Sequence, residues 1–95
     1  EDSLKVLPLF IDRIRHVHCK DRSFTAKEGE EPKETVDGKK MYSCAVGSGC
    51  IQMKEILDQI IASGYDGYLS IEHFGSLDQL SDMERSAAYL KNFCL

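Results

Sequence analysis

The sequence predicts an α/β chain in which parallel strands alternate with helices. Two short segments, at 14–19 and 68–72, have the pattern of β-strands. Each strand is followed by a segment whose apolar residues recur at helical spacing. The first of these segments ends before Gly64, and the second spans about 78–93. Strands that alternate with helices of this length predict parallel strands joined by helical crossovers.

The N-terminal segment predicts a short or distorted helix over 3–10. Either Asp2 or Ser3 supplies a capping side chain, and Pro8 limits how far a regular helix can run. The predicted strand at 14–19 follows directly.

The stretch from Asp21 to Ser43 shows no periodicity. It contains Gly29, Pro32 and Gly38 among charges of both signs. We therefore expect residues 22–43 to form a long exposed loop, and loops of this length in compact domains are usually functional or mobile.

A strong amphipathic helix is predicted after Gly47-Ser48-Gly49. Its apolar stripe consists of Met53, Ile56, Leu57, Ile60 and Ile61. Gly64 stands where a left-handed C-cap is expected.

The last predicted helix spans about 78–93, and Ser81 to Glu84 fits a capping box at its start. The expected apolar face consists of Leu80, Met83, Ala87, Leu90 and Cys94.

Side chains alternate along the two predicted strands, so each strand has a polar and an apolar face. The apolar set, expected to face the helices, is Val17, Cys19, Leu69 and Ile71. The opposite set is Ile14, His16, His18, Tyr68, Ser70 and Glu72. Parallel sheets normally have both faces covered. Polar groups at the carboxyl ends of parallel strands are typical of the inside of a (β/α)8 barrel. The pattern predicts two neighbouring strands of such a barrel, which 95 residues cannot complete.

Composition excludes some classes of function. The formal net charge is −4, and no basic stripe is present, which disfavours nucleic-acid binding. No apolar run approaches the ~20 residues of a membrane-spanning helix. Five residues separate Cys44 from Cys50, which does not fit a zinc knuckle. With no secretory signal visible, we expect reduced cysteines and a cytoplasmic setting.

Three motifs together resemble the C-terminal part of the sugar phosphate isomerase/epimerase family, the xylose isomerase-like TIM barrels. Residues 12–21 are similar to the seventh strand with its H-x-H-x-K-D signature, and Gly47-Ser48-Gly49 to the G-x-G before helix seven. Residues 64–72 are similar to the G-Y-D-G turn and the eighth strand, which ends in a glutamate. The resemblance implies that residues 1–95 form the last two βα units of one barrel, with 22–43 on the active-site side.

The resemblance also implies a metal site. His18 and Glu72 correspond to two ligands of a divalent ion, and the remaining two ligands would lie on earlier strands. One imidazole with several carboxylates suits Mn²⁺, Co²⁺ or Mg²⁺. Glu72 would also act as one of two acid/base carboxylates that move a proton next to a metal-polarised carbonyl.

Other residues are expected around this pair. Lys20 and Arg22 are candidates for substrate binding, and His16 is expected to support the ligands from a deeper layer. Asp21 either orients His18 or caps the following loop.

Three further features lie in the site region. Phe24 occupies the position of an Arg that ketose 3-epimerases use for substrate, which argues against that activity. Gly47-Ser48-Gly49 either cradles an anion or forms a tight turn, the turn being favoured. His73 is expected to point outward or into the loop.

The sequence therefore predicts part of a metal-dependent isomerase or epimerase acting on a sugar or sugar phosphate. A C-glycoside deglycosidase-type or other lyase of the same superfamily is the first alternative. The second is a non-catalytic βαβα fragment that self-associates, since exposed strand edges favour pairing. We expect the isolated chain to be inactive, and to form a homo-oligomer or associate with the rest of a barrel.

Overall fold

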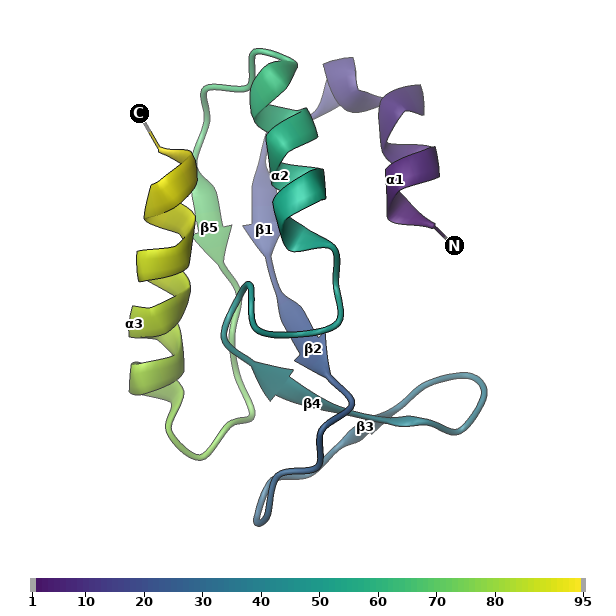
Figure 1. Ribbon diagram of the computed structural model, residues 1–95, viewed down its shortest axis with the longest axis vertical. Coiled ribbons are helices and arrows are strands. Elements are labelled where there is room, and N and C mark those ends of the chain that lie inside the picture. Colours follow the sequence, from purple (N-terminus) through teal and green to yellow (C-terminus); the bar gives the residue numbers. More distant parts are fainter. Residues whose placement is uncertain (1, 95) are drawn as a thin grey trace.

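The computed structural model describes residues 2–94 and has the predicted α/β architecture. Strands β1 (Val17–Cys19) and β5 (Leu69–Ile71) form a parallel pair in which His18 lies opposite Ser70. Helices α2 (Met53–Ala62) and α3 (Gln79–Leu90) lie together on one face of this pair (Figure 1). Within the described residues, this sheet has two strands.

The N-terminal segment is helical but broken, as Pro8 predicts. Helix α1 (Ser3–Val6) is followed by the 3-10 turns η1 (Leu7–Leu9) and η2 (Ile11–Arg13). Asp2 is the cap, because its carboxylate accepts a hydrogen bond from the backbone N–H of Leu4 at 3.0 Å.

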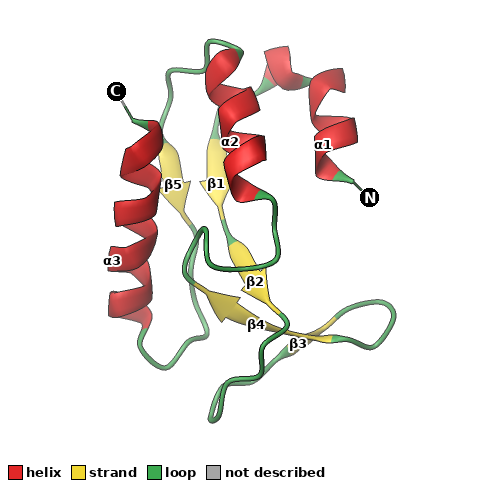
Figure 2. Ribbon diagram, in the orientation of Figure 1, coloured by secondary structure: helices red, strands yellow, loops and turns green. Residues whose placement is uncertain are grey.

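The expectation of a long irregular loop over 22–43 is wrong in its secondary structure. Strands β2 (Asp21–Ser23), β3 (Lys33–Glu34) and β4 (Lys40–Cys44) form an antiparallel sheet in the order β2-β4-β3. Figure 2 shows the β3–β4 hairpin extending away from the helices. These strands are short, and β3 is charged and exposed, so they carry no periodic signal.

The hairpin turn explains one of the glycines in this segment. Gly38 has a φ of +83°, which side-chain-bearing residues rarely adopt, and its N–H donates to the Thr35 carbonyl at 3.0 Å. The Thr35 N–H donates to the Lys39 carbonyl at 2.8 Å, which closes the hairpin.

The core lies between the parallel strands and the two helices. Its buried residues are Cys19, Val46, Met53, Leu57 and Leu90. Val17, Leu69 and Ile71 pack against this cluster, which confirms the predicted apolar strand face. The stripe on α2 is also confirmed, since Met53, Leu57 and Ile60 are buried. Gly64 follows the helix with a φ of +92°, as a left-handed C-cap requires.

The predicted face of the last helix is partly wrong. Leu80 is exposed, whereas Asp82, Ser86 and Leu90 form the buried line of α3. The polar members of this line are buried because they have partners; for example, the Ser86 hydroxyl accepts from the Val46 N–H at 2.9 Å.

The expected capping box is also absent. The N-cap of α3 is Asp78, whose carboxylate accepts from the Ser81 N–H at 3.2 Å. Helix α3 therefore begins before Ser81, the first residue of the predicted box.

No helix within residues 2–94 is long and apolar enough to cross a membrane. The four cysteines are free thiols; Cys19 and Cys44 are buried, and Cys50 and Cys94 are exposed. Burial raises the pKa of Cys19 to about 11, so its thiol is protonated near neutrality.

Candidate active site

The polar residues predicted on one strand face do lie together. His16 and His18 come from the β1 segment, and Ser70 and Glu72 from the β5 segment. The Glu72 N–H donates to the Cys19 carbonyl at 2.9 Å, so the ladder continues one residue beyond β5. This pairing brings the side chains at the carboxyl ends of both strands together at one end of the sheet.

His18 and Glu72 converge at that end of the sheet. The Nδ1 atom of His18 lies 3.4 Å from Oε2 of Glu72. The side chains remain 58% and 44% exposed, so both donor groups face open space on the side of the sheet away from the helices. An imidazole nitrogen and a carboxylate oxygen are therefore presented together.

Lys20 contacts the other oxygen of the same carboxylate. Its Nζ atom donates to Oε1 of Glu72 at 3.1 Å and lies 3.7 Å from the centre of the Phe74 ring. The hydrogen bond and the positive charge of Lys20, with a smaller effect of His18, lower the pKa of Glu72. The Glu72 carboxylate is therefore ionised at neutral pH.

His16 lies behind His18 on the same face. Its Nε2 atom is 3.2 Å from the Ser70 hydroxyl oxygen, and its ring contacts the His18 ring edge-on with the centroids 4.8 Å apart. His16 is thus placed to orient the neighbouring imidazole.

Asp21 has the loop-capping contacts, one of its two expected roles. Its buried carboxylate accepts backbone hydrogen bonds from Gly47 at 2.9 Å, Gly49 at 3.1 Å and Ile51 at 3.4 Å. The N–H groups of Gly47 and Gly49 therefore have an anionic partner from within the chain. This pairing holds the loop before α2 against the end of β2.

Arg22, which is expected to bind substrate, contacts Ser43 in the structure. Its guanidinium donates to the Ser43 hydroxyl at 2.7 Å, and that hydroxyl donates to the Phe74 carbonyl at 2.6 Å. The Lys27 ammonium donates to the Ser43 carbonyl at 2.6 Å. Ser43 therefore connects the antiparallel sheet to the loop after β5.

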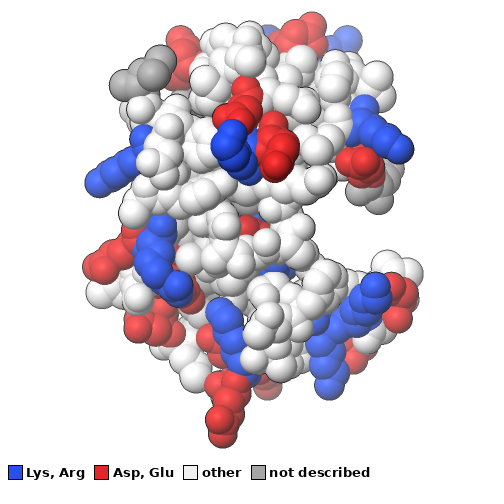
Figure 3. Space-filling model, in the orientation of Figure 1, with Lys and Arg blue, Asp and Glu red and all other residues white. Residues whose placement is uncertain are grey.

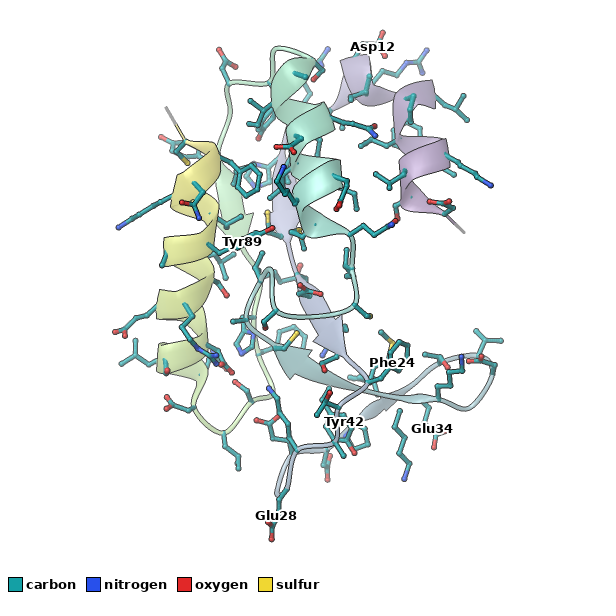
Figure 4. All side chains as sticks on the ribbon, in the orientation of Figure 1. Asp12, Phe24, Glu28, Glu34, Tyr42 and Tyr89 are labelled. Carbon is teal, nitrogen blue, oxygen red and sulfur yellow. The ribbon has the colours of Figure 1, made fainter. Side chains whose placement is uncertain are left out.

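Phe24 lies where the chain leaves β2, and its labelled side chain is close to the β3–β4 hairpin in Figure 4. It is 52% exposed, and the Lys39 ammonium is 5.8 Å from its ring centre. The departure from the ketose 3-epimerase pattern thus places an aromatic ring beside the hairpin.

His73 is buried and contacts Ser76 in the loop between β5 and α3, which is the second of its two expected orientations. Its Nε2 atom lies 2.7 Å from the Ser76 hydroxyl and 3.3 Å from Oδ2 of Asp82, which also pairs with Arg85. A Ser–His–Asp catalytic triad needs the acid and the serine on different ring nitrogens. Here one nitrogen serves both, so the cluster links the β5–α3 loop to α3 rather than activating a nucleophile.

Two residues near the site were not identified from the sequence, namely Phe74 and Ser43. Their contacts depend on how the loop after β5 folds against the antiparallel sheet, and no motif or spacing encodes that.

Charges on the face shown in Figure 3 are mixed in sign, without a large patch of Lys and Arg. This agrees with the acidic composition.

Comparison with known proteins assigns the chain to a family. The model of a family described as xylose isomerase-like TIM barrel matches residues 2–93. Inosose dehydratases are among the similar curated proteins. The one from Geobacillus thermodenitrificans is 37% identical over 75 residues, covering 76% of this chain and 25% of the relative. That from Lacticaseibacillus casei is 35% identical with the same coverage. The one from Clostridium perfringens is 34% identical over 77 residues, again covering 76% of this chain and 25% of the relative.

The chain therefore spans about a quarter of the length of these relatives. No solved structure matched it significantly. The family match covers nearly all of the described residues and agrees with the parallel strand pair and its covering helices. The chain belongs to the xylose isomerase-like TIM barrel family.

Proposed function

We propose that this chain supplies strands seven and eight of a (β/α)8 barrel enzyme that moves a proton next to the carbonyl of a polyhydroxylated substrate. The observation that carries the proposal is the convergence of His18 and Glu72, 3.4 Å apart at the carboxyl ends of adjacent parallel strands. In barrel enzymes this end of the strands holds the active site.

The donor groups fit a divalent cation in part. Two ligands at about 2.1 Å from one ion and at right angles would be about 3 Å apart, close to the observed separation. Within residues 2–94, no group of three or more His, Cys, Asp or Glu side chains is placed to hold a metal ion. The chain would thus contribute His18 and Glu72, and the remaining ligands would come from other strands of the barrel. Mn²⁺, Co²⁺ and Mg²⁺ all suit such ligands.

A bound divalent cation would make the C–H next to a substrate carbonyl more acidic. The chain's own contribution to the reaction is a carboxylate that is kept ionised and in place. In its charged form, Glu72 can accept the proton from that carbon on the remaining lone pair of Oε1, the oxygen that also accepts from Lys20.

We propose dehydration as the complete reaction, because the similar curated proteins are named inosose dehydratases. The substrate loses a proton from the carbon next to the carbonyl and a hydroxyl group from the following carbon. A conjugated double bond and one water molecule result. The isomerase or epimerase reaction shares the first step and differs in returning the proton to a carbon.

The test uses the full-length protein with cyclic and open-chain keto polyols, in free and phosphorylated form, and with Mn²⁺, Co²⁺ or Mg²⁺. Product NMR separates an unsaturated ketone from an isomer. Glu72→Gln should abolish turnover while the fold persists, and Glu84→Gln, an exposed residue of α3, should not change it. Unchanged turnover in Glu72→Gln would remove Glu72 from the mechanism.

We further propose that the site works inside a completed barrel in the cytoplasm, on a sugar-like substrate rather than on nucleic acid. The isolated chain should be inactive and should self-associate, because β1 and β5 carry open edges within the described residues. Light scattering of the isolated 95-residue chain tests this, and a stable monomer with a cooperative melt would refute it.

A further inference from the structure

The environment of the Glu72 carboxylate is asymmetric. Its Oε2 atom faces His18, whereas its Oε1 atom accepts a hydrogen bond from Lys20 at 3.1 Å. An exposed glutamate ordinarily has several side-chain conformations, and each orients the carboxylate differently. The contact with Lys20 selects one in which the second oxygen is directed to His18.

Lys20 can hold the carboxylate only if its own side chain is held. A lysine has a flexible four-carbon stem that loses much conformational freedom when it is fixed. Lys20 is half-buried, with 27% of its side chain exposed, and its ammonium lies 3.7 Å from the centre of the Phe74 ring. An ammonium group over an aromatic face is attracted by the negative potential of the ring.

The backbone at Phe74 is held by the antiparallel sheet, while the residue itself is 49% exposed. Its carbonyl accepts a hydrogen bond at 2.6 Å from the hydroxyl of Ser43, which is 7% exposed. Arg22 donates to the same hydroxyl at 2.7 Å. The contacts therefore run from the antiparallel sheet through Phe74 and Lys20 to Glu72.

We propose that Lys20 and Phe74 are positioning residues, which together fix the Glu72 carboxylate so that one oxygen is turned toward His18. Neither residue exchanges a proton or an electron pair with the substrate in this role. The expected effect of these residues on turnover rests on the proposed function. The contacts of Lys20 with Glu72 and Phe74 do not.

The kinetic test uses the full-length enzyme with Mn²⁺. Lys20→Met removes the ammonium and keeps most of the stem, and should lower kcat about tenfold or more, with KM nearly unchanged. Phe74→Leu removes the ring and keeps an apolar side chain, and should lower kcat about two- to fivefold. Lys20→Arg and Phe74→Tyr keep the charge and the aromatic face, so they should retain most of the activity.

The double variant separates one shared function from two independent ones. If Phe74 acts through Lys20, the combined variant should be no slower than Lys20→Met alone, because the second change removes nothing further. Multiplicative losses, or a Lys20→Met variant with the kcat of the unmodified enzyme, would overturn the proposal. An equal loss in Lys20→Arg and Lys20→Met would also contradict it, since the arginine keeps the positive charge.

A spectroscopic measurement tests the contact without relying on turnover. In protein labelled with ¹³C-lysine, the Lys20 Hε resonances should be shifted upfield by the Phe74 ring, and Phe74→Leu should remove that shift. No ring-current shift in the unmodified protein would refute the inference. Full turnover in Glu72→Gln would instead refute the proposed function, and the NMR result would still decide the contact.

Discussion

The Oδ2 atom of Asp21 accepts the backbone N–H of Gly47 at 2.9 Å, which joins the start of β2 to the loop that leads into α2. The same carboxylate oxygen accepts from Gly49, and the other oxygen accepts from Arg22 at 2.8 Å. A buried carboxylate is tolerated when it has several hydrogen-bond donors. Asp21 therefore holds the loop before α2 in place and does not face the site formed by His18 and Glu72.

Replacing this carboxylate should destabilise the protein. Asp21→Ala leaves several N–H groups without their acceptor, and should lower the free energy of unfolding by about 3 kcal/mol or more. Asp21→Asn keeps one acceptor oxygen and should lose about 1–3 kcal/mol. Urea unfolding of the full-length protein measures both. Asp66→Asn, at an exposed position, is the matched control and should change little. Equal stability of Asp21→Asn and Asp66→Asn would contradict the buried role.

Gly47 should be intolerant of any side chain. Its φ is +91°, and an added Cβ would lie 2.5 Å from ring atoms of Tyr89, which Figure 4 places on the α2-facing side of α3. Gly38 has a similar φ of +83° but nothing within 4 Å of an added Cβ. Gly38→Ala should therefore cost about 1–2 kcal/mol for the left-handed backbone alone. Gly47→Ala should cost about 1–3 kcal/mol more, because the ring must move. Thermal unfolding of the two variants measures both losses of stability. Equal losses in Gly38→Ala and Gly47→Ala would contradict the clash at Gly47.

The parallel strands could be predicted because alternation is a local pattern. Val17 and Cys19 turn toward the helices while His16 and His18 turn away, and the same holds for Leu69 and Ile71 against Ser70. Helix α2 could be predicted for the same reason, since its stripe repeats with the helical period.

The remaining features depend on contacts between distant segments. Strand β3 is a charged two-residue strand that exists through its pairing with β4. Asp82 is buried on α3 although it is charged, because His73 and Arg85 provide partners. The environment of Glu72 was incompletely predicted, since Phe74 reaches Lys20 only through the fold of the β5–α3 loop. Local patterns therefore predicted the two strand-end residues but not what surrounds them.

The two histidines of β1 should differ in their effect on divalent-ion binding. His18→Ala should reduce Mn²⁺ affinity of the full-length protein by more than about a hundredfold, because a direct ligand is lost under the proposed function. His16→Ala should reduce it by about 10- to 100-fold, as is typical of residues that orient a ligand. Isothermal titration with Mn²⁺ tests the order. If His16→Ala lost more Mn²⁺ affinity than His18→Ala, His16 would be the ligand and His18 the residue that orients it.

The buried Asp82 should make stability depend on pH in the acid range. Burial alone raises the pKa of this carboxyl, but hydrogen bonds from Ser76 and Arg85 outweigh burial and hold the pKa below its ordinary value of 3.8. A carboxyl with a lowered pKa in the folded state stabilises the fold above the unfolded pKa, and this contribution disappears as the pH falls through the folded value.

Asp82→Asn should therefore lower the free energy of unfolding by about 1–3 kcal/mol at neutral pH. The difference from the unmodified protein should shrink as the pH falls below 3.8, because the carboxyl then becomes protonated. Asp58→Asn is the control, because its exposed pair with Lys54 on α2 should contribute under about 1 kcal/mol. Urea unfolding across this pH range is the measurement. A difference that persists undiminished at the lowest pH would show that Asp82 acts through packing and not through its charge.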